Sequence, residues 1–224
     1  MKPIKQVLGE FLEEQEARLK PKTYRGYADA IFLFEQCLNG YAYQGLNKKD
    51  SERFDNLYND EHKEFCAVFG PDKIGPSEIG EFLDYFMIRK VMGSKELMKT
   101  VGTVMRRFVK WMGEKGYMQA EKSEVTAERV DELKDELPKV KELSDLIHEY
   151  ILQHPVGDFS EIKDSYFRVT KVKPGKLWLE DDIGPVIVSI EISSLCKVGW
   201  VISLELGKTR KGWEILGSGN VYPG

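Results

Sequence analysis

The sequence contains few cysteines, no long apolar run and no large excess of charge of either sign. Its three cysteines, Cys37, Cys66 and Cys196, are far apart and form no Cys-x-x-Cys pair, which argues against a disulfide framework and a zinc knuckle. No apolar run approaches the roughly 18–20 residues that span a membrane, and the N-terminus lacks the apolar core of a signal peptide. We therefore expect three small buried thiols and a cytoplasmic protein.

The motifs of common enzymes are absent as well. There is no Gly-x-Gly-x-x-Gly, His-Glu-x-x-His or Gly-x-Ser-x-Gly. Gly207-Lys208-Thr209 ends like a phosphate-binding loop, but Ile202 stands where the first glycine of that loop belongs. Asp181-Asp182 is interpreted as an acidic turn rather than a metal pair, and His148 and His154 as surface residues. We expect no cofactor, no metal and no enzymatic activity.

Charge is distributed unevenly along the chain. The formal net charge of −4, if spread evenly, would argue against a nucleic-acid ligand. Lys and Arg number 19 against 18 Asp and Glu in residues 1–120, 5 against 10 in residues 121–154, and 9 against 9 in residues 155–224. The acidity therefore lies in the middle segment, and the first segment has enough cations for a local basic face.

Residues 1–120 have the apolar periodicity of a helical domain. Side chains such as Val7, Leu8 and Phe11 recur three and four positions apart, and Lys20-Pro21 separates the first two segments. The expected helices cover residues 4–19, 22–38, about 50–69, 78–91 and 94–118. We expect these helices to pack around one apolar core.

The last of these helices is apolar on one side and basic on the other. Ser94 is suited to cap it and Gly116 to end it. Its basic residues are Lys95, Lys99, Arg106, Arg107 and Lys110. A second basic group, which lies where the first two helices join, consists of Lys20, Lys22 and Arg25. Because phosphate contacts need Lys or Arg side chains and helix N-termini on one surface, these two groups are the candidate DNA-binding residues.

The acidic segment 121–155 carries its own helical pattern. Its apolar residues with spacing near three and four are Val130, Leu133, Leu137, Val140, Ile147 and Ile151. Pro138 either kinks this helix or begins a second one. One interpretation is a connector helix, or helix pair, packed on a neighbouring domain. The other is a coiled coil that forms a homodimer through residues 126–153.

Beyond His154-Pro155-Val156-Gly157 the apolar period changes to two, which marks a domain boundary. The expected strands cover residues 166–172, 177–180, 185–192, 200–206 and 213–216. Five short strands separated by Gly and Pro predict a small antiparallel β-barrel or sandwich. The expected fold class is α+β with two domains: a helical domain at 1–120, followed by an acidic connector at 121–155 and a small all-β domain at 156–224.

The β region also contains aromatic and basic residues. Trp178, Trp200 and Trp213 are interpreted mainly as core aromatics. The basic segment Gly207–Gly212 is interpreted as a hairpin turn. Small barrels also present such residues to nucleic acid or peptide, which is the alternative interpretation.

Two motifs in the helical segments occur in the order of a known family. Thr23-Tyr24-Arg25-Gly26-Tyr27 is similar to a Thr-Tyr-x-x-Tyr pattern, and Arg106-Arg107-Phe108-Val109-Lys110-Trp111, followed by Gly116-Tyr117, is similar to the end of a last helix. Residues 4–118 thereby resemble the core-binding, SAM-like N-terminal domain of the tyrosine recombinases, the phage integrases, with residues 40–75 longer than usual. The resemblance implies a domain that clamps one face of duplex DNA through helix ends and basic side chains.

The catalytic domain of that family has no counterpart in this sequence. Its His-x-x-Arg motif is missing, because His62, His148 and His154 are not followed by arginine at the third position, and Tyr222 has no such motif upstream. The sequence therefore predicts a non-catalytic DNA-binding or accessory protein, linked to DNA recombination or integration by resemblance alone. The alternative is a protein–protein interaction adaptor that keeps the helical fold without the DNA surface.

Overall fold

The computed structural model describes residues 2–224, which form two compact units. The helical unit ends at Asp135, and the closed-sheet unit begins at Glu136. The α+β class is confirmed, but the boundaries differ from those expected at residues 120 and 155. The expected connector is divided between the units, because its two helices pack against different elements.

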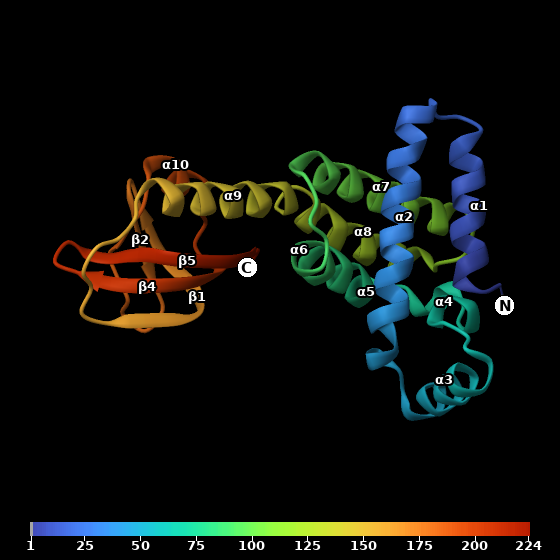
Figure 1. Ribbon diagram of the computed structural model, residues 1–224. Helices are drawn as coiled ribbons and strands as arrows, with labels where there is room; N and C mark the ends of the chain where they lie inside the picture. Colours follow the sequence, from blue (N-terminus) through green and yellow to red (C-terminus); the bar gives the residue numbers. More distant parts are fainter. Residues whose placement is uncertain (1) are drawn as a thin grey trace. The chain divides into compact units, whose positions relative to one another are not determined.

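The elements of the helical unit follow the expected order (Figure 1). They are α1 (Ile4–Glu16), α2 (Pro21–Tyr41), η1 (Ala42–Gly45), α3 (Lys48–Glu61), α4 (Phe65–Val68), η2 (Pro71–Lys73), α5 (Pro76–Gly80), η3 (Glu81–Phe86), α6 (Met87–Arg89), α7 (Lys95–Glu114) and α8 (Ala120–Lys134). The helix expected at 50–69 is interrupted, because His62 adopts φ +53° and ends α3. The helix expected at 78–91 contains a π-helical segment, η3.

The core of the helical unit is aromatic and centres on α7. The ring of Phe11 from α1 lies 5.2 Å from Phe108 and 5.3 Å from Trp111, measured between ring centroids. Phe34 from α2 lies 5.1 Å from Phe82 of η3 and 6.0 Å from Phe108. All five rings are buried. The predicted apolar face of α7 is thus the surface on which α1, α2 and η3 meet.

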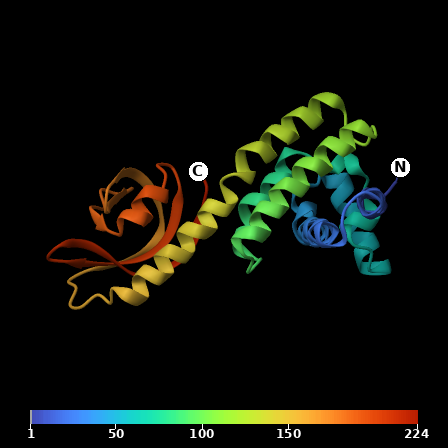
Figure 2. The ribbon, with the colours of Figure 1, turned by 90° about the horizontal axis from the view of Figure 1, so that it is seen from above.

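α8 lies antiparallel beside α7 at close range (Figure 2). A Cβ on Gly102 would lie 2.6 Å from the Cβ of Lys134, and a Cβ on Gly113 would lie 2.6 Å from the Oγ of Ser123. The two glycines are about three turns apart on α7, so α8 fits against a surface without side chains at both points. The first half of the expected connector is therefore part of the helical unit.

The closed-sheet unit consists of α9, five strands and α10 within the described residues. Its elements are α9 (Leu137–Gln153), β1 (Ile162–Lys173), β2 (Lys176–Leu179), β3 (Val186–Ile187), α10 (Ile190–Leu195), β4 (Val201–Thr209) and β5 (Gly212–Tyr222). The strand order is β1-β2-β3-β5-β4, and β4 pairs with β1, so the sheet closes on itself. The pairing of β3 with β5 is parallel. The prediction of an antiparallel sheet is therefore wrong for this pair of strands. Two parallel strands need a long connection, and α10 and β4 form the connection between β3 and β5.

The apolar segment Pro185–Ile192 divides into β3 and α10 instead of forming one strand. The Ser189 hydroxyl accepts a hydrogen bond from the Ile192 amide at 3.1 Å and so caps α10. The Ser193 hydroxyl accepts another from the Gly175 amide at 2.9 Å, which attaches α10 to the β1–β2 turn. The expected all-β domain therefore contains a helix, which apolar alternation alone did not reveal.

α9 belongs to the closed-sheet unit, because it packs against β5 and α10. Pro138 stands in its first turn and begins it rather than kinking it. Glu136, just before α9, pairs with Lys197 and accepts a hydrogen bond from the Trp200 indole at 3.2 Å. Five of the six apolar residues of the expected homodimer seam, Val130, Leu133, Leu137, Val140 and Ile147, are buried within the two units, and Ile151 is half-buried.

The interior of the closed sheet is mainly aliphatic. Its buried residues include Val169, Leu177, Leu179, Val186, Ile202, Leu204, Leu206 and Ile215. These side chains alternate with outward-facing ones along each strand, as the period of two predicts. In residues 2–224, no helix has the length and apolar character needed to cross a membrane.

Candidate nucleic-acid interface

The N-terminal half of α7 presents part of the predicted basic group to solvent. Lys99 is exposed and Lys95 is half-buried. The predicted cap is confirmed, because the Ser94 hydroxyl accepts a hydrogen bond from the Leu97 amide at 3.2 Å. This cap occupies one of the first-turn amides of α7, which leaves fewer of them to bind an anion.

The C-terminal half of α7 uses its cations in ion pairs. The Nε of Arg106 lies 2.9 Å from a carboxylate oxygen of Asp131 on α8, and both side chains are 39% exposed. Glu114 lies 3.9 Å from Arg107 and 3.8 Å from Lys110. The basic side predicted for α7 is therefore mixed here with carboxylates of α8 and of α7 itself, and a mixed face at this point favours the adaptor alternative.

Asp131 holds Arg106 toward α8. Burial acts to raise the pKa of Asp131, but the hydrogen bond from Lys134 and the charge of Arg106 together lower it below its ordinary value. Lys134 Nζ lies 2.6 Å from the other carboxylate oxygen. The carboxylate stays ionised at neutral pH and neutralises two cations at once. Arg106 is thus better explained as a link between α7 and α8 than as a phosphate contact.

The start of α2 carries an open basic group. Lys20, Lys22 and Arg25 are all exposed. In the described chain, no side chain caps this helix, and its first turn contains no acidic residue. Pro21 stands at the first helical position, where its missing amide hydrogen removes no helical hydrogen bond. The first-turn amides, the helix dipole and three cations therefore act on the same region of solvent, which favours an anion there.

A close contact between α2 and α7 brings the two basic groups onto neighbouring helices. A Cβ on Gly26 would lie 3.0 Å from the Cγ2 of Thr100. Arg25 precedes this glycine, and Lys99 precedes this threonine. The structure therefore places the start of α2 beside the first half of α7, as a shared phosphate surface requires.

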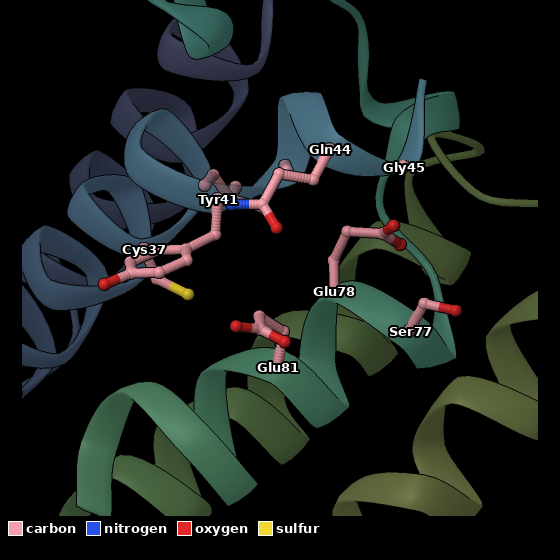
Figure 3. Close-up of a pocket in the computed structure, with 9 residues that line it drawn as sticks. Cys37, Tyr41, Gln44, Gly45, Ser77, Glu78 and Glu81 are labelled. Atoms are coloured by element: carbon pink, nitrogen blue, oxygen red, sulfur yellow. The ribbon is translucent and has the colours of Figure 1, made fainter. Parts of the chain in front are cut away.

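A cavity of about 160 Å³ lies on another part of the helical unit, where the end of α2 and η1 face α5 and η3 (Figure 3). Its walls are apolar at Leu38 and Ala42 and acidic at Glu78 and Glu81. The carboxylates rise from α5 and η3, and the sulfur of Cys37 faces the same space (Figure 3). The cavity would repel phosphate and does not belong to the basic surface.

Of the three buried thiols, that of Cys37 lines this cavity. Burial raises the pKa of Cys37 and Cys66 well above the usual range, and it raises the pKa of Cys196 to about 12. A protonated thiol is a poor nucleophile. All three cysteines are free and buried, as expected. Among residues 2–224, no three His, Cys, Asp or Glu side chains gather in a way that could hold a metal ion.

The sequence analysis did not predict one group of residues on the outside of the sheet, which consists of Trp178, Lys171 and Lys173. Trp178 was expected in the core, but it is half-buried on the outside of β2, whereas Trp200 and Trp213 are buried. The Nζ of Lys171 lies 4.9 Å, and that of Lys173 5.9 Å, from the centre of the Trp178 ring. The available signal was the alternation of the β1–β2 hairpin, which assigns Leu177 and Leu179 to the interior and leaves Trp178 outside.

Comparison with family models, with curated proteins and with solved structures finds no match for this chain. What the protein binds is therefore inferred from its own charges, contacts and surfaces.

Proposed function

We propose that this protein is a non-catalytic DNA-binding protein, with an integrase-like helical unit that grips duplex DNA. The observation that carries the proposal is the contact between Gly26 and Thr100, which joins the open N-terminus of α2 to the basic half of α7. The residues assigned to phosphate contacts are Lys20, Lys22, Arg25, Lys95 and Lys99. They supply charge and a helix N-terminus, the features that hold a protein on the DNA backbone.

The proposal gives a smaller role to Arg106, Arg107 and Lys110 than the sequence suggested, because each is paired with a carboxylate. These ion pairs are partly exposed, and exposed pairs of this kind contribute only about 0–1 kcal/mol to stability. Lys110 is exposed and can exchange Glu114 for a phosphate oxygen. Arg106 is held between helices, so its replacement would disturb the fold as well as the surface.

The proposal predicts duplex binding that depends steeply on salt. Fluorescence anisotropy of a labelled random duplex should give a log–log slope of roughly 0.9 per phosphate contacted. The double variant Lys22→Glu/Arg25→Glu should weaken binding more than about tenfold at low salt and reduce the slope by about 2. The change removes two cations at the helix N-terminus and puts two anions in their place.

The matched control is Lys48→Glu/Lys49→Glu on α3, which changes the net charge equally at exposed positions of the same unit. It should retain duplex affinity within about threefold, because long-range repulsion alone is screened by salt. Absence of duplex binding at low salt would overturn the proposal and favour the adaptor interpretation. Equal losses in the two double variants would also overturn it, since only net charge would then matter.

A further inference from the structure

The outer surface of β1 and β2 carries an aromatic ring set among cations. Trp178 pairs in register with Lys171 across the β1–β2 hairpin. The ammonium groups of Lys171 and Lys173 lie over its ring. Lys176, on the other side of the Pro174-Gly175 turn, is exposed as well. The ring is therefore bordered by positive charge from both strands of the hairpin.

Gly184 supports the same ring and links it to a second basic turn. A Cβ on Gly184 would lie 2.6 Å from the Cδ1 of Trp178, so the indole packs directly on this backbone. The next residue, Pro185, approaches the turn between β4 and β5, because a Cβ on Gly212 would lie 2.9 Å from its carbonyl oxygen. That turn contains Arg210 and Lys211, both exposed. Close contacts thus connect the tryptophan to the cations of two hairpins.

The cations around Trp178 and at the β4–β5 turn differ from most other lysines of the unit. Four lysines of this unit are held in ion pairs, namely Lys141, Lys163, Lys197 and Lys208. Within the described residues, no ion pair is formed by Lys171, Lys173, Lys176, Arg210 or Lys211. Unpaired cations can reach a ligand phosphate without first breaking a salt bridge.

We infer that this surface, the Trp178 surface, binds a single-stranded oligonucleotide, with one base stacked on Trp178 and the neighbouring phosphates held by the two basic hairpins. A single strand exposes its bases, and an aromatic ring in a basic groove recognises such bases without regard to sequence. A duplex keeps its bases stacked internally, so it could not use the ring. The inference adds a second site to the proposed duplex surface and uses different residues.

The β2–β3 turn gives the surface a repulsive border. Glu180 is held by the Arg168 amide, which donates to its carboxylate at 3.0 Å. Asp181 and Asp182 are exposed, each with φ +56°. They directly precede Ile183 and the supporting glycine, so a bound strand would pass near them. Asp181→Asn/Asp182→Asn should therefore tighten oligonucleotide binding about two- to tenfold by removing two negative charges.

The decisive experiment measures binding of labelled oligothymidylate to the full-length protein by anisotropy and by tryptophan emission. Trp178→Ala should weaken binding between about 5-fold and 150-fold, the range for loss of one stacked base. Trp178→Phe should keep most of the affinity but lose most of the quenching, because the other tryptophans are buried. Lys171→Glu/Lys173→Glu should weaken binding by at least about tenfold. This double variant tests the same surface if Trp178→Ala does not fold.

The charge-matched control is again Lys48→Glu/Lys49→Glu, which should bind oligothymidylate as the wild type does. Oligothymidylate affinity that is unchanged in Trp178→Ala and in the lysine double variant would overturn the inference. Equal competition by polyglutamate would overturn it too, because the surface would then recognise acidic chains in general. Lys22→Glu/Arg25→Glu should affect duplex binding and not single-strand binding, so the two proposals fail separately.

Discussion

The two units of this protein differ in where their aromatic residues lie. In the helical unit, five rings from α1, α2, η3 and α7 lie in the core, and each has its centroid within about 6 Å of another. In the closed-sheet unit the interior is mainly aliphatic, and although Trp200 and Trp213 are buried, Trp178 lies outside with lysines over its ring. The cations follow the same division. Those on the second half of α7 face carboxylates, whereas within the described residues no ion pair is formed by Lys171, Lys173, Lys176, Arg210 or Lys211 on the sheet hairpins.

This difference shows why aromatic content alone is a poor guide to binding. A buried ring contributes packing energy and is closed to ligands. A ring on a strand exterior contributes little packing and can be contacted by a ligand. Charged side chains differ in the same way. A cation that is paired with a carboxylate has to break that ion pair before it can bind a phosphate, and an unpaired cation does not. Substitutions at the rings, at the contact between α7 and α8 and at an exposed carboxylate test this difference, and their expected effects decrease in that order.

The largest effect is expected at Trp111. Trp111→Ala should destabilise the helical unit by about 3–5 kcal/mol, because it leaves a large cavity among packed rings. Trp178→Ala should cost less, about 1–2 kcal/mol, because this ring is only partly buried and packs on the Gly184 backbone rather than among other core rings. Chemical denaturation followed by circular dichroism measures both. Comparable costs for the two substitutions would contradict the assignment of one ring to packing and the other to binding.

An intermediate effect is expected where α8 approaches α7. Gly102→Ala should destabilise the helical unit by about 1–2 kcal/mol, because the new methyl group meets Lys134 at 2.6 Å and overpacking outweighs the gain in helix propensity. Gly9→Ala in α1 is the control. Nothing lies within 4 Å of its Cβ position, so it should stabilise the unit by about 0.5–1 kcal/mol. Thermal unfolding should therefore shift in opposite directions for the two variants.

The smallest effect is expected at Glu14 and depends on pH. Hydrogen bonds from Lys115 at 2.5 Å and from the Trp111 indole at 2.9 Å lower the pKa of Glu14. A carboxyl whose pKa is lower in the folded state stabilises that state at neutral pH, and this stabilisation is lost as the pH falls from about 4.3 toward the lowered pKa. Glu14→Gln should remove it and flatten the decline of stability in acid.

Glu13→Gln is the matched control for this prediction, because Glu13 is an exposed neighbour on the same helix. Denaturation midpoints measured across the acid range should fall for this variant as they do for the wild type. An identical acid decline in Glu14→Gln would show that the bonds from Trp111 and Lys115 contribute nothing to stability.

Local signals in the sequence were sufficient for most helices. The cap at Ser94 and the apolar face of α7 were predicted because each depends on residues close in the chain. The ion pair between Arg106 and Asp131 was not predicted, because the two residues are 25 positions apart and only the packing of α8 against α7 brings them together. The contact of Gly26 with Thr100 is of the same kind. The candidate cations could therefore be assigned to their helices from the sequence, and the site they form stays a prediction, but which of them form ion pairs on α7 could not be predicted.

The sheet shows a second limit of sequence reasoning. The strands β1, β2, β4 and β5 were expected, since alternation and turn residues mark them. The expected third strand failed because Ser189 begins a helix within an apolar run. The parallel pairing of β3 with β5 was also missed, because pairing direction depends on the path of the chain through α10 and β4.

The boundary between the two compact units falls between Asp135 and Glu136, so a single peptide bond is the natural place to divide the chain. A fragment that stops at Asp135 retains α8, with the lysine that fits against Gly102 and the carboxylate that holds Arg106. A fragment that begins at Glu136 retains the carboxylate bound by Lys197 and Trp200. Dissection at this bond, rather than at residue 120 or 155, keeps each proposed ligand-binding surface together with these contacts.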